Sequence, residues 1–216
     1  MKESRGRKKR KYDSSRRKAQ SLETQMQIVK AARSLFIERG YAGTSIERIA
    51  KRAGVAPETV YSIFGNKKSI LTRVVDVSVV GDGEPVPLLA RAQIREVENE
   101  TDQRRQIQMF AERIQLIMSR VAPLFTVMRG AAMTESEIAV ILKEYLEGRM
   151  QGMGYFIDRL LANGPLRRNL DKQTAVETTW ALTSAEIYNL FVNDRGWSSD
   201  EYEFWLAETL TRFLLP

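Results

Sequence analysis

The stretch ERIAKRAGVAPETVYSIFGNK, from Glu47 to Lys67, contains two short amphipathic segments with a glycine between them. Ala50 is small enough to let two helices cross closely, and Gly54 tolerates the left-handed backbone conformation that a tight turn requires. Pro57 suits the first turn of the following helix, where its missing N–H would have had no partner. The stretch therefore predicts two short helices joined by a tight turn.

The second short helix has two different faces. An apolar set is expected to close the core of the helix pair, namely Ile49, Ala53, Val55, Val60 and Ile63. The remaining side chains face outward at the start and flank of that helix, namely Pro57, Glu58, Thr59, Tyr61 and Ser62. A plain helical hairpin would explain the apolar pattern, but it would not explain an outward tyrosine beside hydroxyl groups in a basic region. We expect the outward side chains to enter the major groove of DNA.

Further helices are expected on both sides of this pair. Apolar residues recur at helical spacing over residues 22–36, and Gly40 ends that helix. Thr44 and Glu47 have the spacing of a capping box, which predicts the start of the second helix. Lys67 then opens a fourth helix that leads away from the cluster.

Positive charge is concentrated at the N-terminal end of the chain. Residues 1–20 hold ten Lys or Arg against two acids, residues 21–73 hold nine against four, and residues 74–216 hold fifteen against twenty-one. The basic third favours a polyanion through phosphate neutralisation, whereas the acidic remainder would be repelled by it. Residues 1–20 lack apolar periodicity, which predicts a basic disordered arm. Arg5 and Arg7 could lie along a narrow minor groove, or the arm is a solvated tail.

The sequence GDGEPVP, residues 81–87, is the expected linker, because glycines, prolines and acids make up six of its seven residues. It separates a DNA-binding domain at residues 21–80 from a helical domain at residues 88–216. Pro123 is expected to break or kink the chain of the second domain. Helical spacing and caps predict its long helices over about 102–120, from a Thr134 and Glu137 capping box to Asn163, over 171–192, and from a Ser198 and Glu201 capping box to Leu214.

The helical domain carries two further sets of candidate residues. The last two helices are apolar over more than one face, which favours two-fold pairing with a second copy through Trp180, Ile187, Phe191, Trp205, Leu206 and Phe213. Methionines with interleaved aromatic residues suit a cavity for a largely apolar ligand, with candidate lining residues Met118, Phe125, Met128, Met133, Tyr155 and Trp180. The alternative interpretations are helices central in the monomer and ordinary core filling.

Composition excludes much enzyme chemistry. The chain has no cysteine and no histidine, so it lacks thiolate nucleophiles, sulfur metal ligands and the commonest general base. We therefore expect no cofactor, no metal and no enzyme activity. No apolar run approaches the roughly 20 residues of a membrane-spanning helix, and no secretory signal is present, so a cytoplasmic protein without a membrane partner is expected.

The segment TSIERIAKRAGVAPETVYSIFGNKKSIL, from Thr44 to Leu71, resembles the helix-turn-helix signature of the TetR family of transcriptional regulators. The resemblance covers residues 22 to about 75 closely, and the remainder is similar in architecture. It implies an all-α protein with a three-helix DNA-binding domain and a C-terminal helical domain that binds an effector and dimerises. The residues that it assigns to DNA binding, with those expected above, are Thr44, Ser45, Pro57, Glu58, Thr59, Tyr61, Ser62 and Lys67, together with Arg5 and Arg7 of the arm.

Ala56, Pro57 and Glu58 depart from the residues that the family often has, so the base sequence that the protein reads is left open. The resemblance implies a homodimer that binds double-stranded DNA at a palindromic operator, as a repressor released by a small, largely apolar effector. An architectural protein that binds DNA without sequence preference is the alternative. An enzyme for a small apolar substrate is a further alternative, although it would need a catalytic constellation of carboxylate, Ser, Tyr or Lys side chains.

Overall fold

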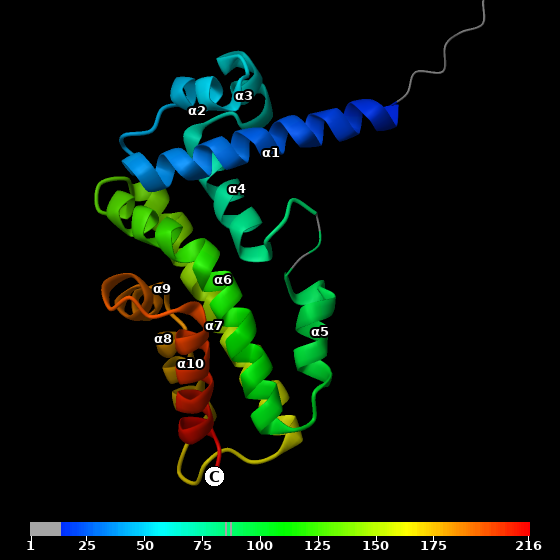
Figure 1. The fold of residues 1–216 in the computed structure, drawn as a ribbon, viewed down its shortest axis with the longest axis vertical. Helices are drawn as coiled ribbons and strands as arrows, with labels where there is room; N and C mark the ends of the chain where they lie inside the picture. The colour runs from blue at the N-terminus through cyan, green and yellow to red at the C-terminus, as the bar shows by residue number, and fades with distance from the viewer. Residues whose placement is uncertain (1–13, 85, 87) are drawn as a thin grey trace, which may run out of the picture.

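The computed structural model describes residues 14–84, 86 and 88–216, and over these residues it is built from helices without strands (Figure 1). The predicted all-α class is therefore confirmed for the described part of the chain. Two groups of helices lie along one elongated molecule, with the N-terminal group at one end (Figure 1).

The N-terminal group forms a compact unit of three helices, which is followed by a fourth helix. Its members are α1 (Ser14–Arg39), α2 (Ile46–Ala53), α3 (Pro57–Phe64) and α4 (Lys67–Val80). Helix α1 packs against α2 and α4, and α2 packs against α3. Their core is closed by side chains that are fully buried, among them Phe36, Ile49, Val60 and Leu71. The apolar spacing thus folds the short helices onto α1 as the sequence predicts.

The C-terminal group is organised around two long antiparallel helices, α6 and α7 (Figure 1). Its members are η1 (Leu88–Ala90), α5 (Ala92–Asn99), α6 (Gln103–Ala132), α7 (Ser136–Asn163), α8 (Lys172–Leu182), α9 (Ala185–Tyr188), the π-helical segment η2 (Asn189–Asp194) and α10 (Ser199–Leu214). Helix α10 packs against α6, and α8 packs against α7. The last helix is closed at its start by the predicted capping box of Ser198 and Glu201.

Helix α4 joins the two groups. It leaves the three-helix unit and runs beside α6, with further contacts to α7 (Figure 1). Arg120 of α6 donates from Nε to the carbonyl of Ser78 at 2.8 Å, and Arg33 of α1 donates to the carbonyl of Arg120 at 3.0 Å. The buried side chains of both groups form one continuous cluster. A displacement of α4 would therefore change side-chain contacts in both groups of helices.

The N-terminal boundaries differ from the prediction in two places. Helix α1 begins at Ser14, so residues 14–20 are helical although they were expected to belong to a disordered arm. Their like charge did not prevent helix formation, because the segment continues directly into a helix that packs from Ile28 onward. Leu22 was expected on the apolar face, but it is 47% exposed. Residues 1–13, with Arg5 and Arg7, lie outside the described residues.

Two predicted capping boxes are absent from the structure. Helix α2 begins after Ser45, whose hydroxyl accepts the N–H of Arg48 at 3.3 Å, so Thr44 is not the cap. Helix α7 begins after Glu135 without a side-chain cap, and the Thr134 hydroxyl donates instead to the carbonyl of Ala131 at 3.4 Å. In both cases the helix begins one residue later than the capping-box spacing predicts.

Pro123 was expected to break or kink the chain, and it does not break α6, which continues through it from Gln103 to Ala132. A proline in a helix interior removes one hydrogen bond, here to the carbonyl four residues earlier, at Ser119. Ser119 is an exposed residue, so water can reach that carbonyl. Packing of α6 along both α7 and α10 outweighs the loss of a single bond.

The single helix predicted over residues 171–192 is divided. Helix α8 ends at Leu182, and Ser184 caps the short α9 by accepting the N–H of Ile187 at 3.3 Å. The chain then continues as the π-helical turn η2. Helix α5 was not predicted at all, since its sequence AQIREVEN has only two large apolar residues.

Candidate nucleic-acid interface and helical-domain cavity

The turn between α2 and α3 depends on a glycine conformation. Gly54 has φ 69° and ψ 30°, a left-handed conformation that residues with a Cβ rarely adopt. A Cβ at this position would meet nothing within 4 Å, so the requirement is the backbone angle and not space. Ala50 is 1% exposed where the two helices meet. Both residues therefore fill the roles that the sequence predicts for them.

Helix α3 presents polar side chains to solvent. Glu58, Tyr61 and Ser62 are exposed, whereas Pro57 and Thr59 are half-buried. Tyr61 is 48% exposed, and its hydroxyl donates to the carboxylate of Glu47 at 3.4 Å. This long bond leaves the phenol free to turn toward another partner. An exposed tyrosine beside hydroxyls on one short helix is an arrangement that suits contacts with the edges of bases and with phosphates.

Ser45 caps α2 in place of Thr44, and Thr44 is buried. Thr44 is 1% exposed, its hydroxyl lies 2.9 Å from the carbonyl of Gly40, and its N–H donates to the carbonyl of Tyr41 at 3.2 Å. Its polar groups are thus engaged inside the protein, so we do not retain Thr44 among the candidate phosphate contacts. Ser45 is half-buried at the start of α2, where the helix N-terminus favours an anion.

Lys67, at the first position of α4, is positioned by an internal aromatic residue. Its Nζ donates to the carbonyl of Tyr41 at 2.9 Å and lies 4.0 Å from the centre of the Tyr41 ring. Burial lowers the pKa of the Lys67 ammonium, and the charge of Glu135 acts in the opposite direction. An ammonium has three donors, so Lys67 can still donate to a phosphate while it is bonded to the carbonyl of Tyr41. Asn66 caps α4 by accepting the N–H of Ser69 at 2.8 Å.

The surface around α2 holds both free and paired charge. Arg52 forms a two-bond ion pair with Glu38, at 2.6 and 3.0 Å. Arg48 is exposed and donates to the carbonyl of Gly43 at 2.7 Å. Hydrogen bonds from its own N–H and from Ser45 hold the pKa of the Glu47 carboxyl below its usual value, so Glu47 stays charged beside Tyr61. The phenol of Tyr61 therefore has a charged acceptor when DNA is absent.

A large cavity lies in the C-terminal group between α4, α6 and α7. Its volume is about 660 Å³, and most of its lining is apolar. Three of the predicted lining residues, Met118, Phe125 and Tyr155, do line it. The sequence did not single out Tyr145 and Arg149 of α7, which also line the cavity. Their positions could have been found from helical periodicity, because both lie on the face of α7 that contains Gly148 and Gly152.

The other predicted lining residues lie elsewhere. Met128 is 0% exposed in the core, and Met133 is 85% exposed at the end of α6, so neither lines this cavity. The methionine-rich pattern could not show which methionines line a cavity, because methionine fills a gap in the core as readily as it lines a cavity. Trp180 lies behind the cavity wall, where its ring is 5.3 Å from the Arg149 guanidinium.

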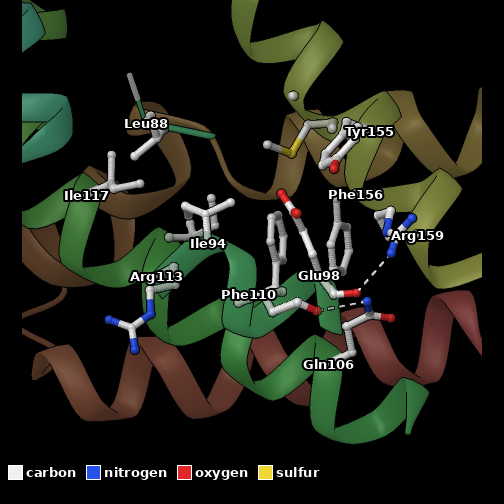
Figure 2. A pocket seen from close by; sticks show the side chains of 14 residues that line it. Leu88, Ile94, Glu98, Gln106, Phe110, Arg113, Ile117, Tyr155, Phe156 and Arg159 are labelled. Carbon is white, nitrogen blue, oxygen red and sulfur yellow. Dashed lines mark hydrogen bonds between the residues drawn. The ribbon is translucent and has the colours of Figure 1, made fainter. Parts of the chain in front are cut away.

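The cavity continues into a smaller apolar recess of about 110 Å³ beneath α5 (Figure 2). Phe110 and Phe156 stack in it with ring centres 3.7 Å apart. Figure 2 shows Gln106 and Arg159 reaching the backbone of α5, where they donate to the carbonyls of Val97 at 3.0 Å and Glu98 at 3.3 Å. These bonds hold α5 over the recess.

The predicted dimerisation face is only partly available. Leu206 is 0% exposed inside the monomer and cannot contact a second copy, because it faces the core and not solvent. Trp180, Ile187, Phe191, Trp205 and Phe213 are half-buried. Phe204, which was not singled out, is 71% exposed and lies beside an open depression of about 500 Å³. It is flanked there by Glu201, Glu208 and Arg212, a pattern that could have indicated an exposed apolar contact.

The described residues contain no group of acidic side chains that could hold a metal ion. Within the same part of the chain, no helix is both long enough and apolar enough to cross a membrane.

Comparison with known proteins agrees with this arrangement. Residues 28–74 match the model of the family described as bacterial regulatory proteins, tetR family. The chain is 23% identical to the uncharacterized HTH-type transcriptional regulator YdeS of Bacillus subtilis over 180 residues, which are 79% of this chain and 85% of that protein. The matched residues 28–74 contain all of α2 and α3.

Two solved structures share the fold. One is NalD, the secondary repressor of the MexAB-OprM multidrug efflux pump in Pseudomonas aeruginosa, with 22% identity, a TM-score of 0.67, and coverage of 91% of this chain and 97% of that chain. The other is the transcriptional regulator FadR from Bacillus subtilis in complex with stearoyl-CoA, with 20% identity, a TM-score of 0.65, and coverage of 86% and 96%. The helix-turn-helix unit of the chain, within residues 28–74, therefore belongs to the tetR family of bacterial regulatory proteins.

Proposed function

We propose that the protein is a ligand-responsive repressor that binds a palindromic DNA operator as a homodimer and is released by a small, largely apolar effector. The observation that carries the proposal is the outward face of α3, where Tyr61 and Ser62 are exposed beside the N-terminus of α4. The DNA contacts that we propose are Ser45, Pro57, Glu58, Thr59, Tyr61, Ser62 and Lys67, with Arg5 and Arg7 of the arm.

These side chains divide into two kinds of contact. Ser45 and Lys67 lie at the N-termini of α2 and α4, where they suit phosphate groups and would set the position of the protein on the duplex. Glu58 and Tyr61 are exposed on α3, where they suit base edges in the major groove. Ala56 provides no side-chain cap to α3. Pro57 has no N–H and the N–H of Thr59 donates to the carbonyl of Ala56 at 3.0 Å, so the N–H of Glu58 is left for a phosphate.

A second copy is proposed to pack on the face of α10 that exposes Phe204. Trp197 and Trp205 lie beside the same depression, so the contact would bury aromatic side chains, which are common anchors of interfaces. Two-fold pairing there would present two α3 helices to successive major grooves, about 34 Å apart along the duplex.

The effector is proposed to occupy the cavity between α4, α6 and α7. Its volume of about 660 Å³ falls within the roughly 300–1,000 Å³ that is usual for ligand sites. FadR, which shares the fold, was solved with stearoyl-CoA, a ligand with a long apolar chain. The apolar lining of this cavity favours a ligand with a substantial apolar part.

Helix α4 is the proposed connection between effector and DNA, because it lines the cavity and also begins at the DNA-binding face. The hydroxyl of Tyr145, in the cavity wall, donates to Asp76 and lies 3.2 Å from the carbonyl of Thr72. At the start of α4, Lys68 pairs with Glu137 of α7 at 3.2 Å. An effector that moves α7 relative to α4 would change both contacts, provided that it binds the two arrangements with different affinity.

The proposal is tested with the purified full-length chain and genomic fragments selected for binding. We expect the selected fragments to share a palindrome and to outcompete random duplex in a mobility-shift assay by about a thousandfold or more at physiological salt. The comparison should be made at fixed ionic strength, since phosphate contacts alone bind any sequence. Equal competition by random duplex would contradict the proposal and would favour an architectural DNA-binding protein.

A further inference from the structure

Two arginines in the wall of the cavity lack a carboxylate partner. Arg73 of α4 and Arg149 of α7 both line the cavity, and neither forms an ion pair with an acidic residue in the described part of the chain. The Nε of Arg73 is buried and has no hydrogen-bond partner there, and one terminal nitrogen donates to the carbonyl of Gly83 at 3.3 Å. Most of its five N–H donors therefore stay unused.

Arg149 is held in place by neutral acceptors. It donates to the carbonyl of Trp180 at 3.0 Å and lies 3.3 Å from the hydroxyl of Thr183. Burial lowers the pKa of its guanidinium, and the charge of Glu186 only partly offsets this. Glu186 itself pairs with Arg129. A buried cation without a counter-ion is costly, so an anion that enters the cavity would gain strongly from it.

The acidic residues of the same wall do not fill this role. Asp76 accepts the hydroxyl of Tyr145, and Glu84 and Glu144 lie at the rim, where Glu84 is exposed and Glu144 is open to solvent. The charges of Glu84 and Glu144 are screened by water, whereas the two arginines are half-buried in a mostly apolar lining.

The recess at the other end of the cavity is apolar, in contrast to the wall that contains Arg73 and Arg149. The main cavity and the recess share six lining residues, Leu88, Ile114, Ile117, Gly152, Met153 and Tyr155, so they form one continuous space. The recess ends at the stacked rings of Phe110 and Phe156 (Figure 2). A ligand that fills both ends therefore needs a charged head and an apolar tail.

We propose that the effector is an amphipathic organic anion, whose carboxylate or phosphate head contacts Arg73 with Arg149 as the second cation, and whose hydrocarbon tail enters the recess. A guanidinium fork binds either head with paired hydrogen bonds. That this ligand is an effector rests on the proposed function, but binding of the anion to the cavity requires no DNA. It also predicts the orientation of the ligand, with the head beside α4.

The test compares ligands of one chain length and different charge, without DNA. Decanoate, decyl phosphate, decanol and decyltrimethylammonium are titrated into the full chain below their micellar concentrations, with calorimetric detection. We expect at least one of the two anions to bind about tenfold or more tightly than both decanol and the ammonium compound. The two anions distinguish a carboxylate ligand from a phosphate ligand. Equal or tighter binding of the neutral or cationic compound would overturn the inference.

Two variants and a control locate the head. Arg73→Met should reduce the preference for the anion to about twofold or less while the chain keeps its thermal transition. Arg149→Met should also reduce it, but Arg149 bonds to the protein, so its result counts only through the ratio of anion to decanol affinity. Arg104→Met, at an exposed arginine near the start of α6 that lines neither the cavity nor the recess, should leave the ratio unchanged. A ratio that survives both cavity variants, or that falls in Arg104→Met, would overturn the assignment.

Failure of this inference can be told apart from failure of the proposed function. A protein that binds decanol as tightly as the anions, yet still prefers a palindrome over random duplex, would retain the regulator and lose the anionic effector. A protein that prefers the anions but competes equally with random duplex would retain the binding site and lose the sequence-specific repressor.

Discussion

The hydroxyl of Tyr145 in α7 donates a hydrogen bond to the carboxylate of Asp76 in α4, so a side chain of the cavity wall holds the helix that follows α3. Burial raises the pKa of the Tyr145 phenol, and its bond to Asp76 raises it further, so the proton stays on the phenol at neutral pH. The two groups of helices are thus joined by a hydrogen bond that a ligand in the cavity can reach.

Removal of this hydroxyl is expected to weaken the connection. Tyr145→Phe should lower the free energy of unfolding by about 1 kcal/mol, because it leaves Asp76 without its donor. If decanoate lowers operator affinity in the wild type, Tyr145→Phe should lose part of that effect. Denaturant titration and a mobility-shift assay measure the two quantities.

Tyr202→Phe is the matched control for this variant. Tyr202 is also buried, but its hydroxyl has no hydrogen-bond partner among the described residues. Its removal should leave the stability unchanged or raise it slightly, since no hydrogen bond is broken. Equal destabilisation by the two variants would show that the bond between Tyr145 and Asp76 contributes nothing specific.

Tyr61 is expected to contribute directly to operator affinity. Tyr61→Ala should weaken operator binding by about tenfold or more, since good base contacts are typically worth about 1–3 kcal/mol each. The fold should be preserved, because the side chain is about half exposed, at 48%. Tyr155→Ala, at 41% exposure in the other group of helices, serves as the control and should leave binding unchanged when no ligand is present. Unchanged operator affinity in Tyr61→Ala would remove Tyr61 from the interface.

Phe204 is expected to stabilise the dimer. Phe204→Ala should raise the dimer dissociation constant by about thirtyfold, the effect of removing roughly 2 kcal/mol at an interface anchor. Val140→Ala is the control, because Val140 is also exposed, at 58%, but lies on α7 away from α10. Sedimentation equilibrium over a range of concentrations gives both constants. A dissociation constant that is the same in the two variants would place the interface elsewhere.

The turn between α2 and α3 should tolerate no side chain at Gly54. Gly54→Ala is expected to destabilise the protein by about 1–2 kcal/mol, because its φ of 69° lies in the left-handed region. Gly154→Ala, in the interior of α7, should instead stabilise it by up to about 1 kcal/mol. A Cβ would meet nothing within 4 Å at either position, so the pair isolates the backbone angle. Similar effects of both substitutions in a denaturant titration would contradict this account.

The basic arm is expected to make the affinity for DNA more sensitive to salt. Residues 1–13 hold seven Lys or Arg, and their deletion leaves α1 intact from Ser14. The slope of log affinity against log salt should flatten by about 0.9 for each phosphate that the arm neutralises. Arg167→Gln combined with Arg168→Gln removes positive charge from the segment between α7 and α8, outside the DNA-binding group, and should leave the slope unchanged. A slope that does not change on deletion would make the arm a passive tail.

The sequence determined the features that depend on neighbouring residues. The turn at Gly54, the start of α3 at Pro57 and the capping box at Ser198 are local requirements of backbone angle, missing N–H groups and short hydrogen bonds, so they can be read from a few adjacent positions. The apolar spacing that folds α2 and α3 onto α1 is equally local, and it places Tyr61 and Ser62 outward.

The tertiary structure decided which residues share a space. Thr44 became a buried structural residue because α1 and α2 close around it, and Met133 became exposed because α6 ends there. Tyr145 lies far along the chain from Asp76 and Arg73, and no local pattern connects them, yet they line one cavity because α4 packs across α7. Periodicity gives the buried face of a single helix, whereas the partner that covers this face is set by the packing of all helices together.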